Sequence, residues 1–156
     1  MIGAAFPMRV SDELLAATRD DEPLAQDMVN IWSHSAYAHY PSNPGPGFWV
    51  LGENLRLMQR IAEVNGPQLL PIDFAACNAY DDALGAAGAL QCPALFILGE
   101  RDQMTPPRAA KSLINACNDR TVVTLATGHA MMAEDPDGVR RALADFARRV
   151  FASETA

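Results

Sequence analysis

An uninterrupted apolar segment in the last third of the chain constrains the fold more than any other feature of the sequence. The segment, residues 94–98 (ALFIL), is bounded by Pro93 and Gly99. A short strand that is apolar on both faces is typical of a parallel sheet covered by helices on both sides. A helix is predicted over residues 107–117, and a second β-rich segment follows at 121–125, which gives the element order of a βαβ unit. The last third of the chain therefore predicts an α/β fold, completed by an amphipathic helix that follows these elements.

The first 90 residues have a different pattern, that of consecutive helices. The first is predicted to begin after Ser11, a residue type that caps helices, and the second at Pro23. Two more are predicted over residues 53–64 and around 72–80, and no segment of residues 11–90 has the pattern of a strand. Only the short apolar start of the chain, which Pro7 interrupts, favours the end of a buried strand.

These patterns predict three parts. Residues 1–10 hold the end of a core strand and the entry to the helical region, residues 11–90 form that all-helical region, and residues 91–156 form an α/β core segment. Charge follows the same division, because residues 1–90 carry 4 basic and 11 acidic residues, whereas residues 91–156 carry 8 of each. The formal charge of −7 therefore belongs to the helical side of the chain.

Composition excludes several classes of partner. The chain has 12 Lys+Arg against 19 Asp+Glu, and Lys111 is its single lysine, so neither nucleic acid nor a membrane is expected as a partner. No apolar run approaches the ~18 residues of a membrane span, and the first residues lack the basic start and long apolar region of a signal peptide. Three cysteines without a C-x-x-C motif favour reduced thiols. Together these features predict a cytoplasmic protein.

Two loops carry the side chains best suited to chemistry. Asp102 follows the first predicted strand shortly after Gly99, and His129 follows the second directly after Gly128. The carboxyl ends of parallel strands form the functional edge of an open α/β sheet, so the acid and the imidazole are expected to meet there. A carboxylate that accepts a hydrogen bond from one ring nitrogen fixes the tautomer and stabilises the imidazolium formed when the other nitrogen takes a proton. The spacing therefore predicts an acid–base pair.

The two loops together resemble the C-terminal part of the α/β-hydrolase family. The pattern P-x-L-x-I-x-G-x-x-D-x-M-T-P occurs at residues 93–106, and G-H-x-x-M-x-E-x-P occurs at residues 128–136. The resemblance implies that Asp102 and His129 are the acid and base of a Ser-acid-His catalytic triad. It further implies that the helical region is a lid, and that about three parallel strands with flanking helices correspond to the sixth to eighth strands of the family.

No nucleophile accompanies this pair in the sequence. The nucleophile of the family lies in a G-x-S-x-G elbow, and neither this motif nor a G-x-D-x-G counterpart occurs in the chain. The resemblance therefore implies a hydrolase of esters or related small apolar substrates that is represented by its C-terminal part, with the serine or aspartate supplied elsewhere. The chain alone is expected to be inactive. The outer edge of the strand that residues 1–5 end is expected to be unpaired, which predicts a partner, either an N-terminal hydrolase half or a second copy.

A different class of function is also open, namely a non-enzymatic binding module in which the acid–histidine pair is vestigial. Four side chains are candidates for lining an apolar pocket, although such residues are more often part of a core: Trp32, Trp49, Met104 and Met131. His34 and His39 lie five residues apart, which misses the i, i+4 spacing of a helical metal pair. No metal site is predicted, and no cofactor is expected.

Overall fold

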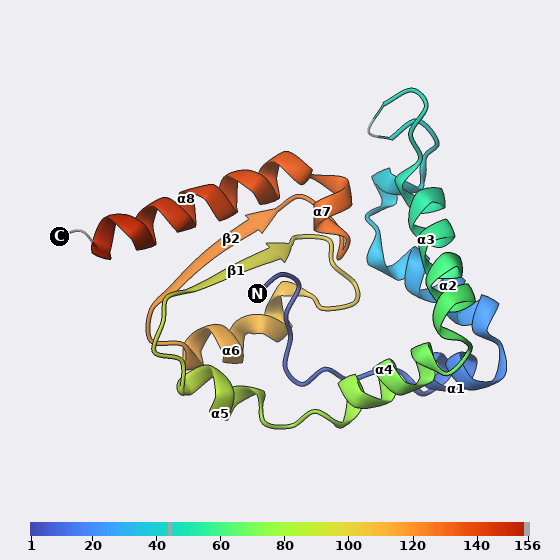
Figure 1. Ribbon diagram of the computed structural model, residues 1–156, viewed down its shortest axis with the longest axis horizontal. Coiled ribbons are helices and arrows are strands. Elements are labelled where there is room, and N and C mark those ends of the chain that lie inside the picture. The colour runs from blue at the N-terminus through green and yellow to red at the C-terminus, as the bar shows by residue number, and fades with distance from the viewer. Residues whose placement is uncertain (44, 155–156) are drawn as a thin grey trace. The chain divides into compact units, whose positions relative to one another are not determined.

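The structure, a computed structural model, describes residues 1–43 and 45–154 and divides into two compact units. One unit consists of Met1–Phe6 with Asp82–Ala156 and is called the sheet unit below; the other, Pro7–Asp81, is called the helical unit (Figure 1). The boundaries of the compact units thus fall before those drawn from the sequence at residues 10 and 90.

Two parallel strands form the centre of the sheet unit. β1 (Ala94–Gly99) pairs with β2 (Arg120–Leu125), in a register that joins Ala94 to Arg120 and Gly99 to Leu125. This confirms the predicted parallel pairing. All six residues of β1 are buried, as its apolar sequence predicts.

The predicted third strand is shorter than expected. Ile2 forms an isolated parallel bridge with Ile97 on the side of β1 opposite β2. Met1 N donates to Leu95 O at 2.6 Å, Ile97 N donates to Met1 O at 3.0 Å, and Gly3 N donates to Ile97 O at 3.0 Å. At Gly3 the backbone adopts a positive φ of 59°, which turns the chain out of the extended conformation and ends the pairing.

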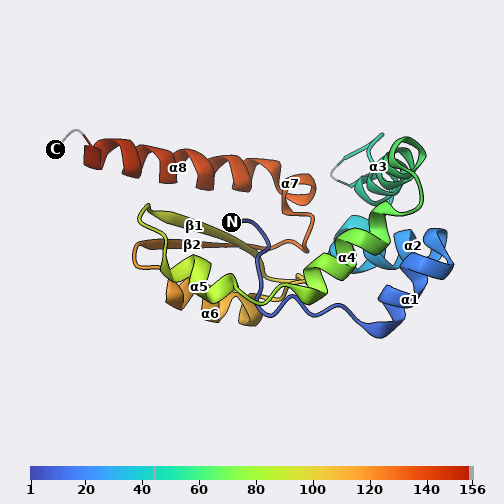
Figure 2. The same ribbon diagram turned by 60° about the horizontal axis from the view of Figure 1, so that its bottom comes forward.

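Helices cover the two faces of β1 (Figure 2). On one face, Phe96 and Leu98 pack in a core cluster with α5 (Ala83–Gly88), the 3-10 helix η2 (Pro107–Ala110) and α6 (Lys111–Ala116). On the other face, Leu95 and Ile97 pack with α7 (Met131–Glu134) and α8 (Pro136–Glu154). Alternate side chains of one strand therefore belong to two cores, which is the three-layer arrangement of an α/β fold.

Two elements of the sheet unit differ from the sequence-based expectation. Residues 83–88 form α5, whose small side chains Ala83 and Ala87 are buried in the α5–α6 cluster, although no helix was predicted there. The segment predicted as one helix over residues 107–117 is instead the 3-10 helix η2 followed by α6. The prediction placed the helix correctly, but its first turn, which begins at Pro107, is 3-10 and not α-helical.

The helical unit contains α1 (Asp12–Asp20), α2 (Glu22–Ser33), the 3-10 helix η1 (Ala36–His39), α3 (Val50–Asn65) and α4 (Leu69–Ala79). Its core contains Leu14, Ala17, Ala25 and Met28. As predicted, Ser11 caps α1, because its hydroxyl accepts a hydrogen bond from Leu14 N at 3.2 Å. No described residue of this unit lies in a strand, and none of the described helices in the protein is long and apolar enough to span a membrane.

Candidate active site

The loops that follow β1 and β2 are hydrogen-bonded to each other. Glu100 N donates to Leu125 O at 2.8 Å, and Arg101 N donates to Thr127 O at 2.9 Å. The loops approach most closely at Gly99, where an added Cβ would lie 2.2 Å from Gly128 O. Gly99 therefore allows the two loops to approach at the carboxyl ends of the strands.

This approach brings Asp102 and His129 into contact. His129 Nδ1 lies 2.9 Å from Asp102 Oδ2. Because a carboxylate only accepts, Nδ1 carries the proton and Nε2 carries the lone pair, an assignment that follows from the hydrogen-bond network. Asp102 is 4% exposed, whereas the His129 side chain is 36% exposed. Among the residues that the structure describes, none is hydrogen-bonded to Nε2, so this nitrogen can accept a proton.

The surroundings of Asp102 favour its ionised form. Burial raises the pKa of the carboxyl group, but the hydrogen bond from His129, the backbone N–H of Thr105 and the charge of His129 act in the opposite direction. The net effect holds the pKa of Asp102 below its ordinary value. Thr105 N–H donates to Oδ1 at 2.8 Å, so both carboxylate oxygens are held.

Glu134 fixes the loop that carries His129. Its Oε1 accepts a hydrogen bond from Gly128 N at 3.0 Å. Glu134 lies at the end of the short helix α7, so the helix and the loop that precedes it are linked directly. The bond is local, because the two residues are six positions apart in the sequence.

Two further residues contact the pair, and sequence reasoning gave neither of them a role. The hydroxyl of Thr105 lies 3.0 Å from His129 Nδ1. Gly3 lies against the same ring, since an added Cβ would be 2.8 Å from His129 Cε1. Thr105 belongs to the pattern matched at residues 93–106, so its position was a usable signal, but nothing in the sequence connects Gly3 with His129.

Comparison with protein families identifies the chain. The model of the family described as serine hydrolase (FSH1) matches residues 52–135, which is more than half of the chain. The chain belongs to the FSH1 serine hydrolase family. No curated protein matches this chain.

Solved structures show the same fold. Similar structures include a thermophilic esterase (TM-score 0.72, 21% identity, covering 96% of this chain and 55% of that one). An esterase from Exiguobacterium antarcticum gives a TM-score of 0.73 at 16% identity, with 94% and 56% covered. An enol-lactonase from Burkholderia xenovorans gives 0.73 at 18% identity, with 94% and 54% covered. The α/β-hydrolase fold predicted from the sequence is thus confirmed, and this chain of the serine hydrolase family spans about half the length of these structures.

The four candidate pocket residues have different surroundings. In the sheet unit, Met131 is fully buried in the core beside Ile97, and Met104 is half-buried in the loop after Asp102. In the helical unit, Trp32 packs against the core, whereas Trp49 is 46% exposed. Met131 thus has the burial of a core residue, whereas Trp32 is half-buried against a core.

No group of three or more His, Cys, Asp or Glu side chains in the described part of the chain is arranged to hold a metal ion. His34 is fully buried in the helical unit, and its Nδ1 donates to Asn30 O at 2.8 Å. The ring is therefore held as part of the interior of the helical unit.

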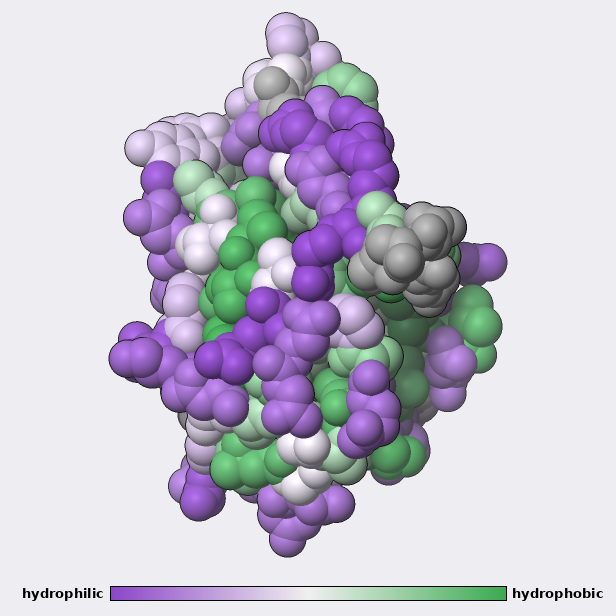
Figure 3. Space-filling view, turned by 90° about the vertical axis from the view of Figure 1, so that its left-hand side faces the viewer, coloured by the Kyte–Doolittle hydropathy of each residue, from purple (hydrophilic) through white to green (hydrophobic). Residues whose placement is uncertain are grey.

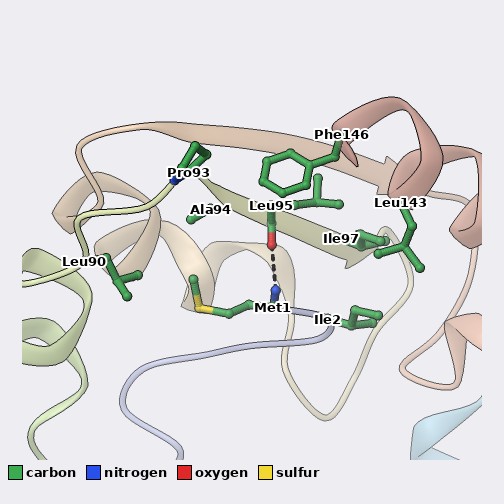
Figure 4. A pocket seen from close by; sticks show the side chains of 9 residues that line it. All are labelled: Met1, Ile2, Leu90, Pro93, Ala94, Leu95, Ile97, Leu143 and Phe146. Atoms are coloured by element: carbon green, nitrogen blue, oxygen red, sulfur yellow. Dashed lines mark hydrogen bonds between the residues drawn. The ribbon is translucent and has the colours of Figure 1, made fainter. Parts of the chain in front are cut away.

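A groove of about 330 Å³ lies along the edge of the sheet at the bridge between Ile2 and Ile97 (Figure 4). Neither Asp102 nor His129 lines it. Its walls are apolar side chains from the Met1 segment, from β1 and the residues before it, and from α8: Met1, Ile2, Leu90, Pro93, Ala94, Leu95, Ile97, Leu143 and Phe146. Hydrophobic surface is also exposed on the side toward which α8 ends, where green residues lie between purple ones (Figure 3).

Proposed function

We propose that this chain supplies the general base His129, and Asp102 as the acid that orients it, to a serine-type hydrolase of esters or related small apolar substrates. The observation that carries the proposal is the hydrogen bond of 2.9 Å between the half-exposed imidazole and a buried, ionised carboxylate. The carboxylate holds the proton on Nδ1, which leaves the lone pair of Nε2 for the hydroxyl of a serine. When Nε2 takes that proton, the negative charge of Asp102 stabilises the imidazolium.

The serine itself lies in a different segment in this proposal, because the 156 residues contain no G-x-S-x-G elbow. The similar esterases and the lactonase are nearly twice as long as this chain, which is compatible with a nucleophile carried by the remaining half of the fold. The family description, serine hydrolase, supports serine over aspartate as the nucleophile.

We further propose that the nucleophile-bearing part joins the sheet at the outer side of Ile2. Met1 and Gly3 direct their hydrogen bonds to β1, whereas no described residue is hydrogen-bonded to the backbone N–H or C=O of Ile2. Such an edge is able to pair with a further strand. The apolar groove beside it offers Leu143 and Phe146 to the side chains of that strand (Figure 4). Self-association through the same edge is the alternative.

The helical unit, Pro7–Asp81, is proposed to act as the lid. Two observations support this assignment: the unit has its own core, and it lies in the sequence between the Met1–Phe6 segment and β1, as an insertion does. Trp49 and Met104 remain candidates for contact with a small apolar substrate, because both retain exposed surface.

An assay with an activated ester tests the proposed function. The chain is measured alone and after fusion of Met1 to the nucleophile-bearing part of the Burkholderia xenovorans enol-lactonase, the part that this chain does not cover. We expect no turnover and no labelling by a fluorophosphonate for the chain alone, and both for the fusion. His129→Ala is expected to lower kcat of the fusion at least about a thousandfold, because the general base is lost. His39→Ala, a histidine of the helical unit, serves as the matched control and leaves kcat nearly unchanged.

Two outcomes contradict the proposal. Turnover by the chain alone that is abolished by His129→Ala would place a nucleophile within these 156 residues. Turnover by the fusion that survives His129→Ala would remove His129 from the mechanism.

A binding module with a vestigial pair is the second candidate, and the apolar groove favours it. Analytical ultracentrifugation separates the two candidates. A stable monomer that binds a small apolar ligand without hydrolysing it supports the binding module, whereas association that ends on fusion supports the hydrolase part.

A further inference from the structure

The hydroxyl of Thr105 lies where three groups of the candidate active site meet. Its Oγ1 is 2.7 Å from Gly3 O, 2.8 Å from Asp102 Oδ2 and 3.0 Å from His129 Nδ1. Thr105 N–H donates to the other carboxylate oxygen, Asp102 Oδ1, at 2.8 Å. One residue thus contacts both oxygens of the acid, the proton-bearing nitrogen of the base, and the backbone of the Met1–Gly3 segment.

The hydroxyl has a single proton and cannot donate fully to every acceptor around it. A carbonyl and a carboxylate only accept, and His129 Nδ1 already donates its proton to Asp102. The shortest of the three contacts is the one to Gly3 O. The proton of Thr105 is therefore shared between two acceptors, Gly3 O and Asp102 Oδ2, and in either case a lone pair of Oγ1 faces the Nδ1–H of His129.

Gly3 contacts the ring from the same side. Its φ is +59°, and an added Cβ would lie 2.8 Å from His129 Cε1 and 3.0 Å from Nδ1. Only a residue without a side chain allows the backbone this close to the imidazole. Gly3 N–H donates to Ile97 O at 3.0 Å, so the position of the segment is fixed relative to β1.

We propose that Thr105 is a positioning residue for His129, and that it makes the orientation of the ring depend on the Met1–Gly3 segment. Its catalytic meaning rests on the proposed function, since a fixed ring keeps the lone pair of Nε2 directed at the nucleophile. A strand that pairs with Ile2 holds the same segment against β1, and so supports the carbonyl to which Thr105 donates. Docking of the nucleophile-bearing part and orientation of the base are coupled through this hydroxyl.

Nuclear magnetic resonance of the ¹⁵N-labelled full chain tests the proposal without any need for activity. Thr105→Val keeps the shape of the side chain but removes the hydroxyl. We expect the Nδ1–H proton of His129 to exchange with water about tenfold faster, because one hydrogen bond is lost, and a second tautomer with the proton on Nε2 to become visible. Thr105→Ser restores the hydroxyl and is expected to match the wild type. Thr124→Val, an exposed threonine of β2, is the matched control for the change of residue type.

The proposal is overturned if Thr105→Val retains the exchange rate and the single tautomer of the wild type. It is also overturned if Thr105→Ser changes the ring as much as Thr105→Val, because the hydroxyl is then not the cause. The wild type provides a measurement that does not depend on the folding of a variant: a nuclear Overhauser effect is expected between the Thr105 hydroxyl proton and His129 Nδ1–H, and its absence contradicts the contact.

Failure of this proposal and failure of the proposed function give different results. If His129→Ala leaves turnover of the fusion unchanged while Thr105→Val alters the ring, Thr105 orients a histidine that is not catalytic. If His129→Ala abolishes turnover while Thr105→Val leaves the ring unaltered, the base is catalytic and is oriented by Asp102 alone.

Discussion

Asp102 combines two properties that oppose each other in an isolated carboxyl group, namely burial and ionisation. Burial alone raises the pKa, yet the hydrogen bonds from His129 and Thr105 hold it below its ordinary value. The ionised form of Asp102 is therefore more stable in the folded chain than in the unfolded chain. Such a group stabilises the fold above its unfolded pKa of about 3.9, and this stabilisation is lost as the pH falls through the lower, folded value.

Asp102→Asn is expected to show this pH dependence. At pH 7 the substitution should lower the free energy of unfolding by about 1–3 kcal/mol, since a charged hydrogen-bond acceptor is replaced by a neutral group. Below pH ~4 the difference from the wild type should shrink progressively, because the unfolded state is protonated first and the folded state follows only at its lower pKa. Urea unfolding at a series of pH values measures the effect. Asp137→Asn, which alters an exposed ion pair with Arg140, is the control and should change stability little at any pH.

A difference between Asp102→Asn and the wild type that is constant from pH 7 to pH 3 would show that the ionised carboxylate is not favoured by the fold. At the residue scale, the spacing of the two loops predicted that Asp102 and His129 meet, and the two side chains are hydrogen-bonded. The contact of His129 with Gly3 was not predicted, because residues 3 and 129 are joined only after the Met1–Gly3 segment pairs with β1.

Strand β1 is the element on which the sheet unit depends. Its side chains alternate between two cores, so each of its residues is enclosed on one face or the other. β2 differs, because its burial alternates between exposed and intermediate residues. The contrast is clear at one position of the ladder: Phe96 is fully buried, and its register partner Val122 is 44% exposed.

We expect this pair of residues to differ strongly in stability measurements. Phe96→Ala should cost about 3–5 kcal/mol, because it removes a large buried side chain and leaves a cavity between β1 and α6. Val122→Ala, the matched control on the neighbouring strand, should cost less than about 1 kcal/mol. Chemical unfolding followed by circular dichroism measures both. Equal losses for the two variants would contradict the assignment of the core.

At the scale of elements, the positions of most helices were predictable because capping residues, prolines and apolar periodicity are local signals. α5 was missed for a physical reason. Its sequence, ALGAAG, contains two glycines and a single large apolar residue, Leu84, which is 40% exposed, so no apolar periodicity marks a helix there. The helix is stabilised by packing of Ala83 and Ala87 against the α6 cluster, which is a tertiary interaction.

The whole molecule has two units with separate hydrophobic cores. The core of the helical unit contains Leu14 and Met28, and the cores of the sheet unit contain Phe96 and Ile97. Charge differs in the same way. The first 90 residues, which include the whole helical unit, carry the acidic excess of the chain. Separate cores in the two units permit local opening of one unit without opening of the other.

Leu14→Ala tests this separation. The substitution should destabilise the helical unit by about 2–5 kcal/mol, since Leu14 is buried in its core. Amide hydrogen exchange, measured by mass spectrometry, should become faster over α1, α2 and α4 and stay unchanged over β1 and β2. Leu57→Ala, at an exposed position of α3, is the control and should change neither unit. Faster exchange throughout the protein would instead indicate a single cooperative unit.

The sequence by itself determined the α/β class, the parallel pairing of two strands, the run of helices before them, and the spacing that brings an acid and a histidine to one edge of the sheet. These features depend on local periodicity and on a topological rule for parallel strands, and both are readable from a linear pattern. Only the tertiary structure decided that the Met1–Gly3 segment pairs with β1 through a single bridge, that α5 exists, and that Thr105 and Gly3 complete the surroundings of His129. Each of these features depends on contacts between groups far apart in the chain, and such contacts stabilise the fold only after the chain has packed.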